Sequence, residues 1–226
     1  MSATEWIIIP CYNEQEVLRD TVCRALETGL QIVIVDDAST QPAAEVLRGL
    51  PVHLIRHPLN LGQGAALQTG MDYALSQGAQ AVLHFDADGQ HRVEDIGQFL
   101  AALSEGADVV LGSRFLRPQD SAGVPRRKRL LLQCARCVNL LFTGLWLSDA
   151  HNGFRALNRR ALQLIRLQEN RMAHASEILQ QIRLHRLQVV EVPTQISYSA
   201  YAQAKGQRLS NSLNIVLDLL VNKLLR

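Results

Sequence analysis

The sequence of 226 residues contains only four cysteines. They lie at positions 11, 23, 134 and 137, and they are too few and too irregularly spaced for a disulfide framework in a chain of this length. No cleavable signal segment precedes the first apolar run. We therefore expect free thiols and a cytoplasmic location, with peripheral attachment to the inner face of the cell membrane as an alternative.

The net charge is also small, and the apolar runs are short. A formal charge of +2 is too small to indicate nucleic acid as the main partner. No window reaches the ~18 uninterrupted apolar residues that a membrane-spanning helix needs. Because 47% of the residues are hydrophobic, the chain can still bury one sizeable core.

Apolar runs alternate with helical patterns along the first half of the chain. Strands that are nearly all apolar and alternate with helices are typical of a parallel sheet covered on both faces. We predict an α/β fold with a mostly parallel, Rossmann-like central sheet, in which residues 1–115 form a nucleotide-binding half. The expected strands are 6–9, 32–35, 52–55, 81–85 and 109–111, and the expected helices are 17–26, 43–48, 65–75 and 93–103.

The second half differs in character. A loop rich in proline and glycine leads into a basic cluster at 126–129 and a long apolar helix, and a helix at 175–184 and a strand at 189–192 follow. The last segment, 209–226, repeats leucine and valine at i, i+3, i+4 and i+7, which predicts an amphipathic helix. This helix has three interpretations: packing on the core, a homodimer seam, or an anchor on a membrane surface.

Acidic residues follow two of the apolar runs. Ligands of open α/β sheets bind beyond the carboxyl ends of the strands, and Asp36 and Asp37 end one strand there. Asp86 and Asp88 end another, and residues two apart share a face of a strand. Together with Gln90 they offer hard oxygen ligands for Mg²⁺ or Mn²⁺, which would neutralise a leaving diphosphate. A solvated acidic turn is the alternative interpretation.

Glycine is scarce where the common phosphate-binding loops need it. The first strand-to-helix turn has no glycine, which argues against a Rossmann dehydrogenase or a P-loop enzyme. Gly62 and Gly64 resemble part of a dinucleotide fingerprint but lack the third glycine. We expect them to let the backbone approach a ligand or to make a tight turn into a helix.

Six segments, taken in order, resemble the motifs of inverting family-two glycosyltransferases, and among these the polyprenyl-phosphate sugar transferases of the dolichol-phosphate-mannose synthase type. The segments are 8–14, 35–39, 60–65, 86–91, 112–114 and 149–155. The resemblance implies one GT-A domain over 1–208, with 1–115 binding the nucleotide sugar and 116–208 binding the acceptor.

The resemblance also implies roles for individual residues. Metal binding falls to Asp86, Asp88 and Gln90. Contact with the acceptor phosphate falls to Arg114 and to the cluster Arg127, Lys128 and Arg129. Lys128 occupies a position at which the family has an arginine. Lysine keeps the charge but cannot form the bidentate hydrogen bonds of a guanidinium. Nucleotide-sugar binding falls to Pro10, Tyr12, Glu14, Val35, Asp37, Gly64, Asp86 and Arg208.

Asp149 is the candidate catalytic base, with Asp88 and Arg114 as the other catalytic residues. A hydroxyl acceptor needs a carboxylate to take its proton, whereas a phosphate acceptor is already ionised. In the second case Asp149 would only orient Arg155 or the acceptor. A salt-bridge or helix-capping aspartate is the alternative.

The expected activity is transfer of a sugar from a UDP- or GDP-sugar to a polyprenyl phosphate, dependent on Mg²⁺ or Mn²⁺. Two other functions remain open at this point. One is transfer to a glycan or lipid hydroxyl in cell-surface polysaccharide synthesis. The other is a non-catalytic partner subunit that binds nucleotide sugars.

Overall fold

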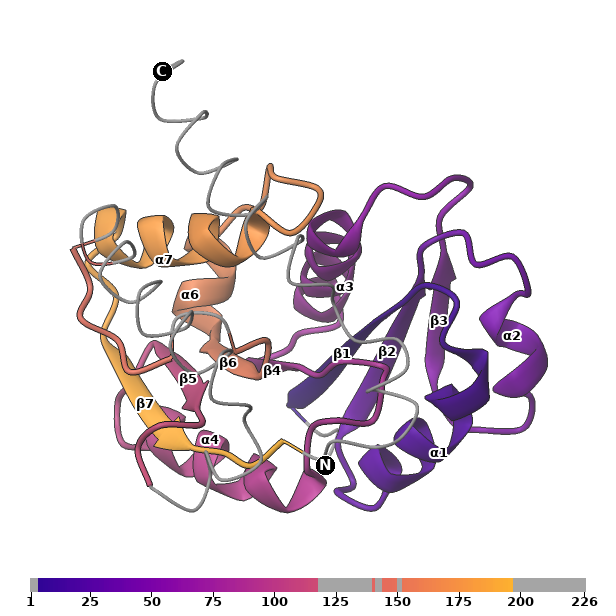
Figure 1. Ribbon diagram of the computed structural model, residues 1–226, viewed down its shortest axis with the longest axis horizontal. Helices are drawn as coiled ribbons and strands as arrows, with labels where there is room; N and C mark the ends of the chain where they lie inside the picture. Colours follow the sequence, from indigo (N-terminus) through magenta and orange to yellow (C-terminus); the bar gives the residue numbers. More distant parts are fainter. Residues whose placement is uncertain (1–3, 118–139, 141–143, 150–151, 197–226) are drawn as a thin grey trace, which may run out of the picture.

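The computed structural model describes residues 4–117, 140, 144–149 and 152–196, and these form an α/β fold around a seven-stranded sheet (Figure 1). Each strand and helix expected in the first half is present, as are those expected at 175–184 and 189–192. The strands are β1 (Glu5–Cys11), β2 (Gln31–Asp36), β3 (His53–Arg56), β4 (Ala81–His84), β5 (Val109–Ser113), β6 (Arg155–Asn158) and β7 (Val189–Pro193).

Helices cover both faces of this sheet, as predicted. In Figure 1, α3, α6 and α7 lie on one side of the strands, and α1 and α4 lie on the other. The helices are α1 (Gln15–Leu26), α2 (Ala43–Val46), α3 (Gln63–Ser76), α4 (Ile96–Ser104), α6 (Arg159–Leu164) and α7 (His174–Leu184), with a short 3-10 turn at Val93–Asp95.

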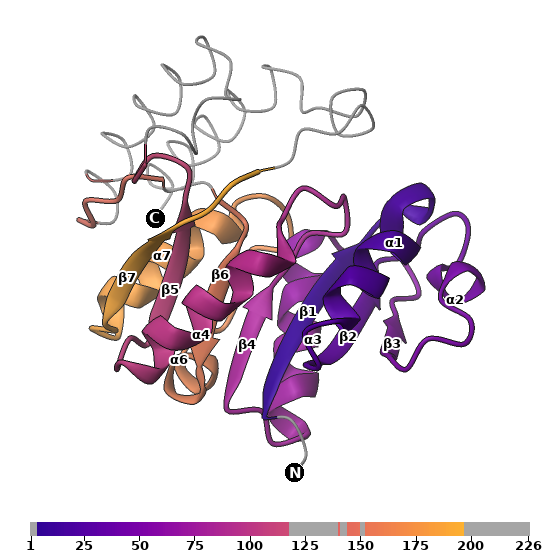
Figure 2. The same cartoon turned by 90° about the horizontal axis from the view of Figure 1, so that it is seen from below.

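The strand order is β3-β2-β1-β4-β6-β5-β7. Among the described strands, β6 alone runs antiparallel to its neighbours, β4 and β5. The other pairs are parallel, so the carboxyl ends of six strands lie along one edge, the upper edge in Figure 2. Ligand sites of such sheets lie beyond this edge.

Two hydrophobic cores sandwich the sheet. Ile8 and Val33 point into the core beneath α3 and α7, while Ile7 and Ile32 point into the core beneath α1 and α4. All four side chains are almost completely buried. Burial on both faces explains why the strands of the first half are continuous apolar runs instead of alternating ones.

Strand β6 and helix α6 were not expected from the sequence. The strand has four residues, Arg-Ala-Leu-Asn, and begins with a charged side chain, so it shows neither an apolar run nor an alternation. Asn158 ends it and caps α6 by accepting a hydrogen bond from the backbone N–H of Ala161 at 2.9 Å. The antiparallel direction of β6 brings the preceding segment to the carboxyl edge of the sheet.

Several expectations concern residues outside the described part of the chain. They are the helix at 209–226 with its dimer or membrane role, the side chains of Arg127, Lys128, Arg129 and Arg208, and two of the cysteines. Of the described cysteines, Cys11 and Cys23 are free thiols. In the part of the chain that the structure describes, no helix combines the length and hydropathy that crossing a bilayer requires.

Candidate active site

The carboxyl edge of the sheet gathers the acidic side chains that the sequence singled out. Strand β2 leads into Asp36 and Asp37, and β4 leads into the segment 86–90. Strand β5 leads into Arg114, and the segment that enters β6 carries Asp149 to the same edge, where its carboxylate binds Arg114. The structure thus brings together residues that are far apart in the sequence.

Asp36 is a structural residue. Its carboxylate accepts hydrogen bonds from the backbone N–H groups of Ser39 at 2.8 Å and Ala43 at 3.0 Å, and it pairs with Arg56 at 3.2 Å. These contacts turn the chain after β2 and begin α2. A carboxylate near the first turn of a helix is favourable because the N–H groups there lack helical partners.

Asp37 shapes the wall of the site. Its carboxylate accepts hydrogen bonds from the backbone N–H groups of Leu61 at 2.9 Å and Gly62 at 2.7 Å, and it contacts Nδ1 of His57 at 2.8 Å. Gly62 has φ +105°, a conformation that favours glycine, and it begins α3. Both oxygens of Asp37 are engaged in holding this loop, and its contact with a nucleoside stays a prediction.

The other residues expected to hold the nucleotide differ in exposure. Tyr12 is 48% exposed and Pro10 and Glu14 are half-buried, so a ligand can reach them. Val35 has no exposed surface, and its contact with the nucleotide stays a prediction. Gly64 is also buried. Its backbone N–H donates a hydrogen bond to the carbonyl of Asn170 at 2.8 Å.

Asp86 is held by two neighbours. Its Oδ1 accepts a hydrogen bond from the amide of Gln63 at 3.0 Å, and its Oδ2 contacts Nε2 of His91 at 2.9 Å. Burial would raise the pKa of Asp86, but the charge and hydrogen bond of His91, together with His174 and Arg155, lower it below its ordinary value. Asp86 is therefore ionised and fixed in direction.

Asp88 is held only by its own loop. Its Oδ1 accepts from the backbone N–H of Gln90 at 3.0 Å, and its Oδ2 accepts from the Gln90 side chain at 2.7 Å. Burial, followed by the negative charge of Asp86, raises the pKa of Asp88 to about 6. The two carboxylates repel each other, and a divalent cation between them would remove this repulsion.

The oxygen donors of Asp86, Asp88 and Gln90 fit Mg²⁺ or Mn²⁺. Within the described residues, no three His, Cys, Asp or Glu side chains converge as a complete metal site. Two carboxylates alone leave most of an octahedral shell to substrate oxygens and water, which is how Mg²⁺ is usually bound beside phosphates.

Three basic side chains lie buried behind Asp86. Burial and the charge of Arg155 lower the pKa of His84 to about 3 and that of His174 to about 4, so both imidazoles are neutral at pH 7. Burial lowers the pKa of Arg155 to about 10, which keeps it charged, and Asp86 and Asp149 favour that charge. Arg155 thus supplies a permanent positive charge between the two parts of the site.

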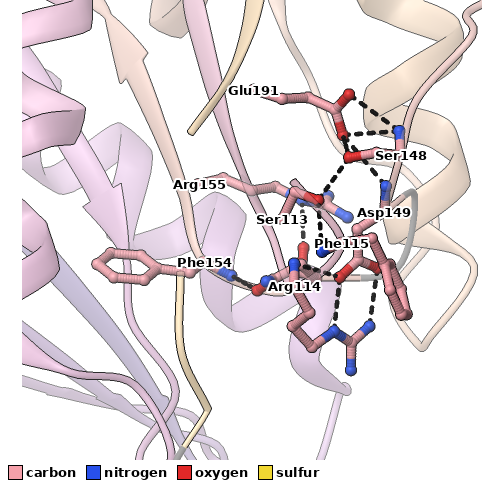
Figure 3. Close-up of polar contacts among 9 residues, drawn as sticks. Ser113, Arg114, Phe115, Ser148, Asp149, Phe154, Arg155 and Glu191 are labelled. Carbon is pink, nitrogen blue, oxygen red and sulfur yellow. Dashed lines mark hydrogen bonds and ion pairs between the residues drawn. The ribbon is translucent and has the colours of Figure 1, made fainter. Parts of the chain in front are cut away.

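Arg114 and Asp149 form a buried ion pair (Figure 3). The Asp149 carboxylate accepts from Nε of Arg114 at 2.5 Å, from its terminal nitrogen at 2.7 Å and from its backbone N–H at 3.2 Å. The side chains are 6% and 1% exposed. Both carboxylate oxygens therefore accept hydrogen bonds from Arg114, and a role of Asp149 as a catalytic base stays a prediction.

Glu191, which the sequence analysis did not single out, completes this network. Its carboxylate accepts from the backbone N–H and the hydroxyl of Ser148 and from the backbone N–H of Asp149. The Ser148 hydroxyl also contacts that of Ser113 at 2.5 Å. The available signal was an acidic residue inside the apolar strand Val-Val-Glu-Val-Pro, a position where a carboxylate needs a partner.

Comparison with known proteins identifies a family. A family model described as "Glycosyl transferase family 2" matches residues 6–166. A UDP-N-acetylglucosamine–dolichyl-phosphate N-acetylglucosaminyltransferase of Methanococcus voltae is 28% identical over 97% of this chain and 96% of its own. Polyprenol monophosphomannose synthase of Mycolicibacterium smegmatis is 32% identical over 71% of this chain and 64% of its own.

Among solved structures, glucosyl-3-phosphoglycerate synthase from Mycobacterium tuberculosis, in complex with Mn²⁺, UDP and glucosyl-3-phosphoglycerate, has a TM-score of 0.69. The match covers 96% of this chain and 77% of that one, at 16% sequence identity. At this identity the likeness concerns the fold, and it confirms the predicted GT-A architecture.

Proposed function

The chain belongs to glycosyl transferase family 2, and we propose that it transfers a sugar from a UDP- or GDP-sugar to a polyprenyl phosphate, with inversion and with Mg²⁺ or Mn²⁺ bound. The resemblance drawn from the sequence motifs is confirmed by this membership, and the chain is a glycosyltransferase. The observation that carries the proposal is the position of Asp86 and Asp88 directly after β4 at the carboxyl edge of the sheet, with Asp86 held by Gln63 and His91.

The donor would bind at this pair. Asp86, Asp88 and Gln90 would hold the cation, which neutralises the diphosphate as it leaves. Tyr12 and Glu14, which a ligand can reach, would contact the nucleoside, with Asp37 and Gly64 holding the loop beside it. The ordered state of Asp86, fixed by Gln63 and His91, supports this assignment, because a ligand that is held in place binds metal more tightly.

The acceptor would bind on the side of Arg114. Both relatives named above have a polyprenyl or dolichyl phosphate in their names. A phosphate oxygen is already ionised, so its attack on the anomeric carbon needs no strong base. The occupied carboxylate of Asp149 fits this acceptor better than a hydroxyl, and we assign Asp149 the role of positioning Arg114. Arg127, Lys128 and Arg129 stay predicted phosphate contacts, and Arg208 a predicted donor contact.

Transfer from a radiolabelled nucleotide sugar to dolichyl phosphate tests the proposal. Dolichol, the same lipid without the phosphate, is the matched control, and a panel of UDP- and GDP-sugars with Mn²⁺ or Mg²⁺ identifies the donor. We expect a labelled lipid from dolichyl phosphate only. Product from dolichol instead would favour the hydroxyl acceptor. Donor binding without any transfer would favour the non-catalytic subunit, and no donor binding with either metal would refute the proposed site.

A further inference from the structure

Glu191 lies two steps from Arg114 along a continuous chain of hydrogen bonds, and we infer that it is a positioning residue that aims Arg114 at the acceptor phosphate. The inference rests on the proposed function, because it takes Arg114 as a phosphate contact. Glu191 lies on β7, one of the two edge strands of the described sheet (Figure 3). The inference therefore gives this strand a role in positioning Arg114.

The first step joins Glu191 to the turn at 148–149. The backbone N–H of Ser148 donates to both Glu191 oxygens at 2.8 and 2.9 Å, its hydroxyl donates at 2.7 Å, and the backbone N–H of Asp149 donates at 3.1 Å. All these donors point at one carboxylate. Hydrogen bonds of this kind, with a charged acceptor, are about twice as strong as neutral ones.

The second step joins the turn to Arg114. Asp149 holds the Arg114 guanidinium through two nitrogens and also accepts from its backbone N–H. On the other side, Ser113 precedes Arg114 and bonds the hydroxyl of Ser148. The direction of the guanidinium therefore depends on where the turn sits, and Glu191 fixes the turn.

A purely structural role for Glu191 makes a different prediction, and the chain offers a matched control for it. Asp108 directly precedes β5, at the end of the β5–β7 pair away from Arg114, and it is buried, whereas Glu191 is half-buried in the middle of β7. Its carboxylate accepts from the backbone N–H of Gln188 at 2.9 Å and from the side chains of Asn158 and Arg160. It secures the start of β5 to the residue before β7, whereas Glu191 secures the turn at 148–149, and these contacts of Asp108 do not lead to Arg114.

The kinetic test compares Glu191→Gln with Asp108→Asn in transfer to dolichyl phosphate. Glutamine removes the negative charge, and its NH2 group in place of Oε2 would face the backbone N–H of Ser148, so the turn would be held less firmly and Arg114 would be positioned less well. We expect kcat/KM for the acceptor to fall roughly 10- to 100-fold, with the Kd for UDP and Mn²⁺ changed less than about twofold. Asp108→Asn should lower the melting temperature but leave both constants unchanged. Glu191→Asp, which keeps the charge, should recover part of the rate.

A second test needs no substrate. Melting temperatures of Glu191→Gln, Arg114→Lys and the double variant measure whether the two residues are coupled. Non-additive shifts are expected for this pair and additive ones for Asp108→Asn with Arg114→Lys. Additive shifts for both pairs, or an unchanged acceptor kcat/KM in Glu191→Gln, would overturn the inference. Absence of transfer by the unaltered chain, with the coupling intact, would instead count against the proposed function.

Discussion

The segment 86–90 and the Arg114–Asp149 pair lie at the same edge of the sheet, but their carboxylates have opposite electrostatic surroundings. In the first, Asp88 sits beside another carboxylate, and its pKa is raised to about 6. In the second, Asp149 is neutralised by a guanidinium bound through two nitrogens. Under the proposed function the first region would take a cation that arrives with the substrate, whereas the second already contains a positive charge, the Arg114 guanidinium.

This difference has an energetic meaning. Repulsion between two carboxylates is unfavourable in the metal-free protein, and a bound cation would reverse the sign of the interaction. A buried ion pair is costly to break from one side, because the remaining charge stays buried without a partner. Substitutions of Asp88 and Asp149 should therefore change activity and stability in different proportions.

The largest effect is expected from Asp88→Asn. This substitution removes one charge from the cation site, and we expect kcat to fall roughly 10²- to 10³-fold. The melting temperature of the metal-free protein at pH 7 should stay the same or rise, because repulsion with Asp86 is relieved. Transfer assays and calorimetry on the same preparation check both. A stable variant with full activity would remove the cation from the proposal.

Asp149→Asn should give the converse result. The Arg114 guanidinium would remain buried beside a neutral amide, and the free energy of unfolding should fall by about 3 kcal/mol. Activity with dolichyl phosphate should fall about 10-fold through loss of positioning. Denaturant unfolding and initial rates measure the two quantities. A much larger loss of rate with unchanged stability would mean that Asp149 acts directly in the reaction and not through the position of Arg114.

Much of this comparison was predictable from the sequence. The strands of the first half were predicted because a strand buried on both faces is a continuous apolar run, and Asp86 and Asp88 followed from their place at a strand end. The pairing of Asp149 with Arg114 was not predictable, because 35 residues separate them and nothing local links them. The same holds for Glu191, whose partners come from another segment.

Gln63→Ala sharpens the contrast within the donor region. Asp86 would lose one of its two fixed neighbours while His91 stays, and the Kd for Mn²⁺ should rise about 10-fold. Gln68→Ala removes a half-buried glutamine of the same helix that bonds Asp72 and Leu167 instead of Asp86, and it is a suitable control for the helix itself. Isothermal titration with Mn²⁺ and UDP measures the difference. Equal affinities would show that Asp86 does not depend on Gln63.

The last prediction concerns pH. The pKa of Asp88 is raised from 3.8 to about 6 in the folded protein, so the folded state binds more protons than the unfolded state between these values. The stability of the metal-free protein should accordingly fall as pH rises from about 4 to about 6, and Asp88→Asn should flatten this part of the profile. As pH rises over the same window, the affinity for Mn²⁺ should increase by up to about tenfold per pH unit, because Asp88 must lose its proton to bind the metal. A flat profile in the unaltered chain would contradict the raised pKa.

The strand order and the antiparallel strand β6 also lay beyond sequence reasoning. Residues 155–158 pair with β4 on one side and β5 on the other, so their conformation is set by neighbours that are distant in the chain. Pairing of this kind outweighs the weak local preference of Arg-Ala-Leu-Asn for a strand. The need for glycine at position 153 also depends on a residue distant in the chain. A Cβ there would lie 2.7 Å from Oδ2 of Asp86, which is too close.

The hydroxyl contact between Ser113 and Ser148 affects how much the length of the segment between them can vary. It ties together two points 35 residues apart in the sequence, and the ends of the intervening segment are thereby fixed to each other. Doubling the length of a segment whose ends are joined costs only about 0.6 kcal/mol of closure entropy. The number of residues between these serines can therefore change at little cost in free energy, while the sheet and the donor site keep their geometry.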